Sequence, residues 1–388
     1  MSASSSGRFA ELGVRGPTRR PGGDVLSSRA LGRATLMRQL LLRRTDLPVV
    51  AAVERVLGLN AQSPNPPYVA LWTRLEHFAI NDLTTAIENQ SLVRSTMMRA
   101  TQHLMSVPDF RLIRPVLAPL LNRVQRNAFG RRTAGIDLDA LLAEATELLA
   151  DGRVLTRPEL GRLLAERRPG ADPTALGWTV QYLVPLVHPA PSGTWNTYGA
   201  TPFAHADWTG IRPEASAEQV RQMVCRYLAG FGPATVADAR AWSGVPGLPE
   251  VFERLRPELK TYTNEAGREL FDLPDAPIPA ADTPASVRFL PEFDPPLLAY
   301  ANRTRLMTDE VRRQVCVGAV VAATVLVDGT VAATWSASHT NDTAVLTVRP
   351  LRRLAPSDQS AVEAEADRLL AFTYPQATER HTRLRAVR

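Results

Sequence analysis

The sequence of residues 57–75 is LGLNAQSPNPPYVALWTRL, and this stretch decides the local fold. The helical apolar pattern before it stops at a polar tripeptide, Asn60-Ala61-Gln62. A second apolar pattern starts after three prolines, and proline is favoured in the first turn of a helix. The stretch therefore predicts two helices joined by a short irregular connection, in which two carboxamide side chains stand one residue apart.

Further helices flank this stretch, and two strands come after them. Four helices are predicted where apolar residues recur at spacings of three and four, over residues 26–44, 47–59, 66–78 and 81–90. Residues 91–107 mix β-branched and apolar side chains, as strands do. Helices followed by a strand pair are typical of a winged helix. Residues 26–107 are therefore expected to form a first winged-helix unit that contains the tripeptide.

The pattern returns in residues 108–211. Amphipathic helices are predicted over residues 108–129, 137–151 and 155–167. Thr156, followed three residues later by Glu159, forms a capping box at the start of the third helix. Residues 186–208 then predict two strands around a Ser192-Gly193 turn. We expect a second winged-helix unit whose wing is this β-hairpin.

The rest of the chain completes the expected fold class, which is mainly α with β. Three helices and a strand-like stretch predict a third winged-helix unit over residues 212–279. Residues 280–388 are rich in strands, with a tight Asp328-Gly329 turn and a terminal helix, and predict a small β-barrel-like domain. Residues 1–25 are rich in Ser, Gly, Pro and Arg and predict a disordered basic arm. The architecture expected is three tandem winged-helix units and a C-terminal β-barrel-like domain.

Composition narrows the functional classes. The 388 residues carry a net charge of +6, and Lys260 is the only lysine among 45 cationic side chains. This balance favours a polyanionic partner, although a GC-rich genome produces similar arginine contents. Two distant cysteines and six scattered histidines predict neither a disulfide framework nor a metal site. Without a signal-like start or a long apolar run, we expect a bacterial cytoplasmic protein that is neither secreted nor membrane-embedded.

Four stretches together resemble a known family, the winged-helix DNA glycosylases called AlkZ-like, which are relatives of the azinomycin-resistance glycosylase. The resemblance extends from about residue 30 to residue 350 and depends on the order and spacing of residues 57–75, 99–117, 227–245 and 289–307. It implies hydrolysis of the N-glycosidic bond of alkylated purines in double-stranded DNA. Bulky N7-alkylguanine adducts are the expected substrates, with interstrand crosslinks as a further candidate, and no cofactor is expected.

The resemblance also implies the catalytic residues. The family has a Gln-x-Gln pair, and the matching positions are Asn60 and Gln62. An N7-alkylated purine is already a cationic leaving group, so the site needs chiefly to hold a water and to stabilise an oxocarbenium-like transition state. We expect Gln62 to orient the water and Asn60 to assist, since its shorter side chain places the amide oxygen about 1.5 Å short of a glutamine's. The alternative interpretation is that Asn60 only caps the preceding helix.

Other side chains are candidates for contact with DNA or substrate: His103, Arg94, Arg99, Arg111, Trp195, Asn196 and Tyr198. The histidine matches one that the family has near the first wing, and the arginines around it would form a phosphate-binding face. The aromatic hairpin would enter the minor groove. Each has a structural alternative: a buried histidine, a solvated surface or core packing. Glu292 and Asp294 suggest a paired-carboxylate glycosidase, but the neighbouring prolines favour a turn instead.

The sequence therefore favours a monofunctional, monomeric DNA glycosylase that acts in DNA repair or in self-resistance to a genotoxic natural product. The alternative is a non-catalytic winged-helix DNA-binding protein, either a regulator or a lesion binder. A third possibility is a protein that sequesters a small-molecule drug. Release of free modified base from DNA distinguishes the glycosylase from both.

Overall fold

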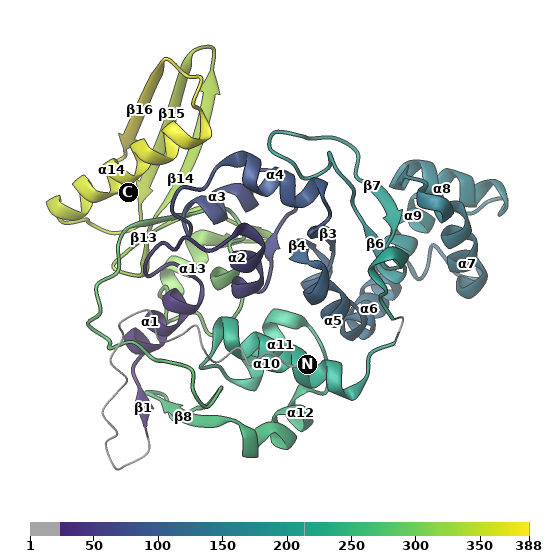
Figure 1. Ribbon diagram of the computed structural model, residues 1–388, viewed down its shortest axis with the longest axis horizontal. Helices are drawn as coiled ribbons and strands as arrows, with labels where there is room; N and C mark the ends of the chain where they lie inside the picture. The colour runs from purple at the N-terminus through teal and green to yellow at the C-terminus, as the bar shows by residue number, and fades with distance from the viewer. Residues whose placement is uncertain (1–23, 213, 388) are drawn as a thin grey trace.

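The structure is a computed structural model that describes residues 24–212 and 214–387 (Figure 1). Residues 1–23 of the predicted basic arm lie outside this range. The fold mixes helices with small sheets in four consecutive regions. In Figure 1 the first region lies at the centre, the second extends to the right, the third lies below, and the C-terminal sheet projects at the upper left.

The first region contains the tripeptide. Its elements are α1 (Ser28–Arg38), α2 (Val49–Val56), β2 (Leu59–Asn60), α3 (Pro66–Trp72), α4 (Ile80–Glu88), β3 (Leu92–Thr96) and β4 (Gln102–Ser106). The sheet order is β2-β4-β3, and both pairings are antiparallel. From α2 onward the order of elements is one helix, one strand, two helices and a hairpin.

The end of α2 decides between two interpretations of Asn60. The helix ends at Val56, and Leu57 is its C-cap in the left-handed conformation, with φ of 61°. Gly58 comes next with φ of 88°, and a Cβ atom there would lie 3.2 Å from the Leu104 carbonyl oxygen of β4. The chain therefore turns at residues 57 and 58, and Asn60 is already part of β2. The interpretation of Asn60 as a helix cap is wrong.

The second region repeats this order. Its elements are α5 (Val107–Val116), α6 (Ala118–Phe129), α7 (Leu138–Leu148), β5 (Leu155–Thr156), α8 (Arg157–Glu166), α9 (Pro173–Leu183), β6 (Leu186–Val187) and β7 (Pro202–His205), with sheet order β5-β7-β6. The predicted single helix over residues 108–129 is two helices that meet at Leu117. The two strands predicted within residues 186–208 are present as the antiparallel pair β6–β7. The tight turn predicted at Ser192-Gly193 is wrong, because residues 188–201 form a long irregular connection between the two strands.

The third region has three helices and a hairpin: α10 (Ala217–Phe231), α11 (Val236–Ser243), α12 (Leu248–Leu255), β8 (Lys260–Asn264) and β9 (Glu269–Asp272). An isolated bridge between Ala234 and Phe271 stands where the other two regions have their first strand. Strand β1 (Val25–Leu26) pairs in parallel with β8 at the other edge.

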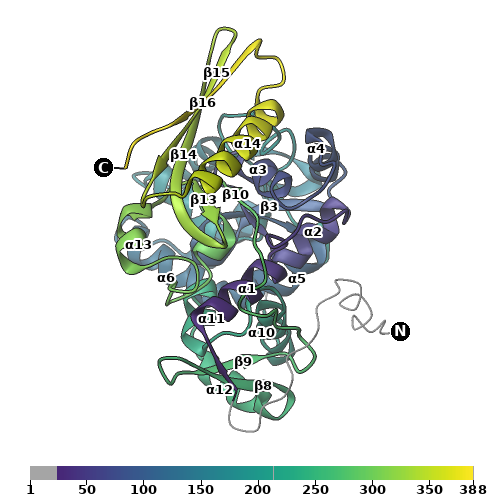
Figure 2. The ribbon, with the colours of Figure 1, turned by 90° about the vertical axis from the view of Figure 1, so that its left-hand side faces the viewer.

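The C-terminal region is an open sheet rather than a barrel. Its strands are β10 (Arg288–Leu290), β13 (Thr324–Val327), β14 (Thr330–Thr340), β15 (Thr343–Pro350) and β16 (Glu379–Leu384), in the order β10-β13-β14-β15-β16. Its smaller elements are α13 (Asp309–Val315), β11 (Cys316–Val317) and β12 (Val320–Val321), and the long helix α14 (Pro356–Thr373) lies between β15 and β16 in sequence. Within the described residues β10 and β16 remain separate edges, so the predicted barrel-like closure is wrong. Figure 2 shows β14, β15 and β16 projecting beyond the body of the molecule.

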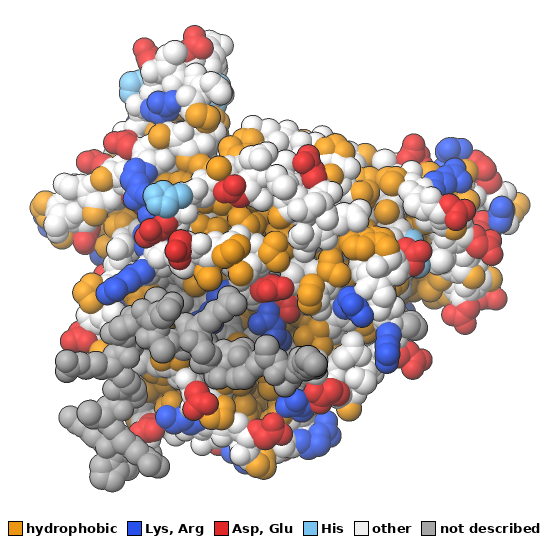
Figure 3. Space-filling model, in the orientation of Figure 1, with side chains coloured by type: hydrophobic (Ala, Val, Ile, Leu, Met, Phe, Trp, Pro, Cys, Tyr) orange, Lys and Arg blue, Asp and Glu red, His pale blue; other side chains and the backbone are white. Residues whose placement is uncertain are grey.

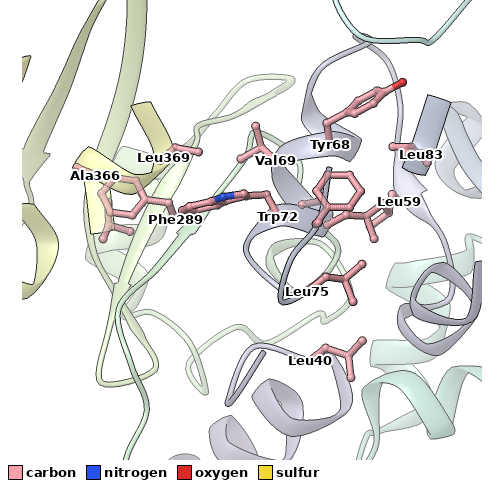
Figure 4. Close-up of a cluster of buried hydrophobic side chains, with 14 of the residues drawn as sticks. Leu40, Leu59, Tyr68, Val69, Trp72, Leu75, Leu83, Phe289, Ala366 and Leu369 are labelled. Atoms are coloured by element: carbon pink, nitrogen blue, oxygen red, sulfur yellow. The ribbon is translucent and has the colours of Figure 1, made fainter. Parts of the chain in front are cut away.

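Shared cores and buried ion pairs fix the regions to one another. Trp72 of α3 and Phe289 of β10 belong to one buried cluster, together with Leu369 of α14 (Figure 4). Arg74 lies just beyond α3 and forms a buried ion pair with Asp294, with an Nη2 to Oδ1 distance of 2.6 Å. The first region is therefore held firmly against the segment after β10.

Candidate active site

The tripeptide leaves the sheet at the end of β2. Asn60 lies opposite His103 of β4, and the Ala61 amide donates to the Gln102 carbonyl oxygen at 2.8 Å. Asn60 is only 6% exposed, and its Oδ1 accepts a hydrogen bond from the Gln62 amide at 3.4 Å. Gln62 itself is exposed, and its carboxamide makes no hydrogen bond to any described residue. One carboxamide is thus fixed within the protein, while the other is free to meet a substrate or water.

Arg94 of β3 supports this connection from beneath. Its Nε donates to the Ala61 carbonyl oxygen at 2.7 Å, and its Nη2 reaches the Gln62 carbonyl oxygen at 3.4 Å and the Gln102 side chain. The side chain is 6% exposed, and burial lowers its pKa to about 10, so it stays charged at neutral pH. With its guanidinium directed to protein acceptors, Arg94 positions residues 61 and 62 rather than forming part of an exposed phosphate-binding face.

His103 and Arg99 form a second buried support. The Thr101 carbonyl oxygen lies 3.0 Å from His103 Nδ1, which places the proton there and leaves Nε2 to accept from Arg99 Nη2 at 3.3 Å. Burial, and then the Arg99 charge, lowers the pKa of His103 to about 3, so the ring is neutral. Arg99 also donates to the Trp242 carbonyl oxygen at 2.9 Å, and burial lowers its pKa to about 10. These contacts hold the β3–β4 hairpin, and Asn60 pairs with its strand β4.

The connection between β6 and β7, residues 188–201, reaches from the second region over the first (Figure 1). Trp195 packs edge-on against Tyr68 of α3 at 5.2 Å, and against Phe372 of α14 at 5.9 Å. Asn196 and Asn65 exchange hydrogen bonds: the Asn196 amide donates to Asn65 Oδ1 at 2.8 Å, and Asn65 Nδ2 donates to Asn196 Oδ1 at 2.7 Å. The connection is therefore attached to the start of α3.

The same connection also touches the support under the tripeptide. Arg94 Nη1 donates to Ser192 Oγ at 2.8 Å. Gly193, with φ of 87°, lies so close that a Cβ atom there would be 2.9 Å from Arg94 Cδ. Tyr198 is 68% exposed, and Arg111 on α5 is also exposed. Of the seven predicted contact residues, these two and Asn196 are the exposed ones, and the structure gives Asn196 a structural partner.

Glu292 is a neighbour of the tripeptide that the sequence pattern did not favour as a site residue. Ser63 Oγ donates to Glu292 Oε1 at 3.3 Å, across 229 positions of sequence. Its supposed partner Asp294 is held in the buried ion pair with Arg74. The prolines do mark a turn, as the sequence indicated, with a short 3₁₀ helix at Pro295–Leu297. That turn presents Glu292 to the residue after Gln62.

Much of the arginine content is structural. Seven arginines of the described residues are at most 7% exposed: Arg33, Arg38, Arg74, Arg94, Arg114, Arg288 and Arg305. On the face shown in Figure 3, positive and negative side chains are interspersed beside a band of hydrophobic ones. The basic composition alone therefore does not locate a DNA-binding surface on this face.

Membrane-spanning helices and metal-ligand clusters are both absent from residues 24–212 and 214–387. In this part of the chain, no helix has the length and apolar character needed to cross a membrane. Nor do these residues include a group of three or more His, Cys, Asp or Glu side chains arranged to hold a metal ion.

Comparisons with known proteins bear on the family and the fold of the chain. A family model described as DNA glycosylase AlkZ-like matches residues 53–372. Among solved structures, the Streptomyces sahachiroi DNA glycosylase AlkZ matches with a TM-score of 0.75 and 22% sequence identity, over 92% of this chain and 100% of that one. A comparison with curated protein sequences gives no significant match. The structural match shows a shared fold, and the family match covers most of the chain.

Proposed function

The chain belongs to the AlkZ-like DNA glycosylase family, and we propose that it excises alkylated purines, chiefly bulky N7-alkylguanine adducts, from double-stranded DNA. The observation that carries the proposal is the exposed Gln62 carboxamide on a connection whose backbone is fixed by Arg94. A flexible loop could not hold a water against a reacting sugar, whereas this connection is preorganised.

In the proposed reaction, the Gln62 amide oxygen accepts a hydrogen bond from a water and directs it toward C1′ of the sugar. The C1′–N9 bond breaks as the water adds, and the positive charge on the alkylated purine is neutralised when the base leaves. Asn60 assists by holding the Gln62 amide. Removing a single hydrogen-bonding group that acts on the transition state costs about 10²–10³ in rate.

DNA would be held by the exposed side chains around this connection. We assign phosphate contact to Arg111 and minor-groove contact to Tyr198, with Trp195 and Asn196 keeping the β6–β7 connection in place. Arg94, Arg99 and His103 act from beneath as positioning residues. We further propose that residues 26–107, 108–211 and 212–279 are winged-helix units, because the same order of elements recurs. The protein would act as a cytoplasmic monomer in DNA repair or in self-resistance to a genotoxic natural product.

The test is single-turnover release of free base from duplex DNA that carries N7-methylguanine or one bulky adduct. We expect wild type to release base and Gln62→Ala to be slower by about 10²–10³. Gln314→Ala removes another exposed glutamine side chain, on α13, and should keep the wild-type rate. Absence of release by wild type from both substrates would sink the proposal.

The alternative function is a DNA-binding protein without catalysis, and the observation that favours it is Asn60, which stands where the family has glutamine. A non-catalytic DNA-binding protein, either a lesion binder or a regulator, would bind DNA without turnover. Asn60→Gln tests this point: release by Asn60→Gln but not by wild type would mean that the asparagine has silenced a glycosylase scaffold. A preference for one undamaged sequence would identify a regulator instead.

A further inference from the structure

Glu292 is held rigidly beside the candidate site. On its N-terminal side β10 ends at Leu290, whose carbonyl oxygen accepts a hydrogen bond from Trp335 Nε1 at 2.8 Å. On its C-terminal side Phe293 has φ of 57°, and Asp294 is bound by both terminal nitrogens of Arg74 at 2.6 and 2.9 Å. The backbone around Glu292 is therefore anchored on both sides, which fixes the point from which its half-buried side chain extends.

The carboxylate of Glu292 is also unpaired, although this protein is rich in arginine. No Arg, Lys or His of residues 24–212 and 214–387 forms an ion pair with it, and Ser63 Oγ is the one hydrogen-bond donor it has there. Asp294, two residues on, is neutralised by Arg74. Carboxylates in partly buried positions usually acquire a cationic partner, because leaving a charge without one costs stability. An unpaired one next to a candidate site is a candidate for chemistry.

We propose that Glu292 is a further catalytic residue of this chain, the general base that accepts the proton of the attacking water. The inference rests on the proposed glycosylase function. The Ser63 hydroxyl donates to Oε1 and orients the carboxylate, which leaves Oε2 available to the water held by Gln62. A carboxylate beside C1′ also stabilises the positive charge of an oxocarbenium-like transition state.

The proposed step is balanced in atoms and electrons. The water oxygen forms a bond to C1′ while the C1′–N9 bond breaks, and the electron pair of that bond leaves on N9, which neutralises the cationic purine. One water proton passes to Glu292, which returns it to solvent. Two carboxamides can orient a water but are too weakly basic to take its proton. Glu292 supplies that function, which also explains how a site with the shorter Asn60 would work.

The experiment uses single-turnover release of N7-methylguanine from duplex DNA by the full-length protein. General-base catalysis contributes about 10²–10⁴ in rate, so Glu292→Gln should be at least 10²-fold slower. Its affinity for the same DNA should stay within about threefold of wild type, because the amide keeps the size and the Ser63 contact. Glu363→Gln on α14, an exposed glutamate in the described part of the chain, is the matched control and should keep the full rate.

Chemical rescue separates catalysis from a structural role. Adding formate to Glu292→Ala should restore part of the lost rate, since a small carboxylate can occupy the vacated space; a structural defect would not respond. Glu292→Asp, which keeps the charge and shortens the reach, should fall between wild type and Glu292→Gln. If Glu292→Gln proves unstable, with a lowered thermal midpoint, the rate of Glu292→Asp is the measurement that decides.

The outcomes are distinct. If wild type and Glu292→Gln release base at rates within threefold while Gln62→Ala is inactive, Glu292 is not the base and the glycosylase function stands. If Glu292→Gln loses rate and DNA affinity in equal measure, its role is in binding and the inference is overturned. If wild type releases no base from any alkylated duplex, the proposed function fails and the inference fails with it.

Discussion

The first and second regions have the same order of elements, and they differ in the segment that comes after the first strand. In the first region β2 ends at Asn60, and residues 61–65 form an irregular connection before α3. In the second region β5 ends at Thr156, and α8 begins at the next residue, with Thr156 as its cap. The chain thus carries an added connection in the first region at the place where the second has none.

At the hairpins the second region, not the first, has the longer connection. In the first region β3 and β4 are joined by residues 97–101, whereas residues 188–201 separate β6 from β7 in the second. The two added connections meet directly through Asn65 and Asn196, and Arg94 of β3 links them by donating to both the Ala61 carbonyl oxygen and Ser192 Oγ. The repeated scaffold is therefore similar in both regions, and the candidate site is built from connections that only one region or the other possesses. This is the usual division between a rigid scaffold and functional loops.

The largest expected effect comes from breaking the support under the first connection. Arg94→Met leaves the Ala61 carbonyl oxygen and Ser192 Oγ without their donor, which should cost about 3 kcal/mol of unfolding free energy. Because a displacement of about 1 Å can cost 10²-fold in rate, base release should fall by about that factor. Both are measurable, by urea denaturation and by single-turnover release.

Arg114→Met provides the matched control. Arg114 is equally buried, and it donates to the Tyr182 and Val184 carbonyl oxygens of the second region at 2.8 and 3.1 Å. We expect a similar loss of stability without the loss of rate. Equal losses of rate in both variants would show that Arg94 has only a general structural role.

A smaller effect is expected from the contact between the two added connections. Trp195→Ala removes the packing on Tyr68 and Phe372 and should cost about 2 kcal/mol of stability, less than for a fully buried aromatic. The freed connection should lower the rate of base release about tenfold. Trp178→Ala, which removes a half-buried ring stacked on Phe129 and Tyr182 in the second region, should destabilise similarly and leave the rate unchanged.

Local signals in the sequence predicted local structure well. The capping box of Thr156 and Glu159 and the Asp328-Gly329 turn are both present, because neighbouring residues alone decide them. Helix α9 was not predicted, since its mixed apolar, aromatic and β-branched residues obscure the helical period. The start signal was nevertheless there: Asp172 caps the helix and Pro173 is its first residue.

The candidate site depended on contacts that no local pattern contains. The resemblance to the family pointed to Asn60 and Gln62, but the pairing of Ser63 with Glu292 joins residues 229 positions apart. Arg94 was expected in an exposed phosphate-binding face because a strand-like sequence does not say which side is covered. It is covered by residues 188–201 of the next region. Similarly, the sequence predicted the strands of the C-terminal region. Whether the sheet closes into a barrel depends on pairing between its first and last strands, which no local pattern contains.

Each of the two regions buries one neutral histidine, which predicts an acid-dependent loss of stability. Burial, followed by a nearby arginine, lowers the pKa of His103 and of His188 to about 3. Unfolded histidine has a pKa of about 6.5, so between these values the unfolded state binds one more proton per histidine. The free energy of unfolding should therefore fall by about 1.4 kcal/mol per pH unit per histidine as the pH drops below about 6.5.

Denaturation with urea between about pH 7 and pH 5 measures this slope. His103→Gln and His188→Gln should each remove one histidine's share of this slope, about 1.4 kcal/mol per pH unit, whatever their effect on stability at neutral pH. An unchanged slope in His103→Gln would mean that this ring does not remain neutral in the folded protein. The comparison of the two variants shows whether the first and second regions respond to acid alike.

The smallest effect is expected at the position in the second region that corresponds to the end of β2. Thr156→Ala removes the side chain that accepts from the Glu159 amide, and the loss of such a cap costs about 1 kcal/mol. Because α8 begins directly after it and no added connection depends on Thr156, the rate of base release should not change. A drop in urea midpoint with a full rate would support the view that the strand end of β5, unlike that of β2, takes no part in the site. A loss of rate would show that the second region's strand end also takes part in the site.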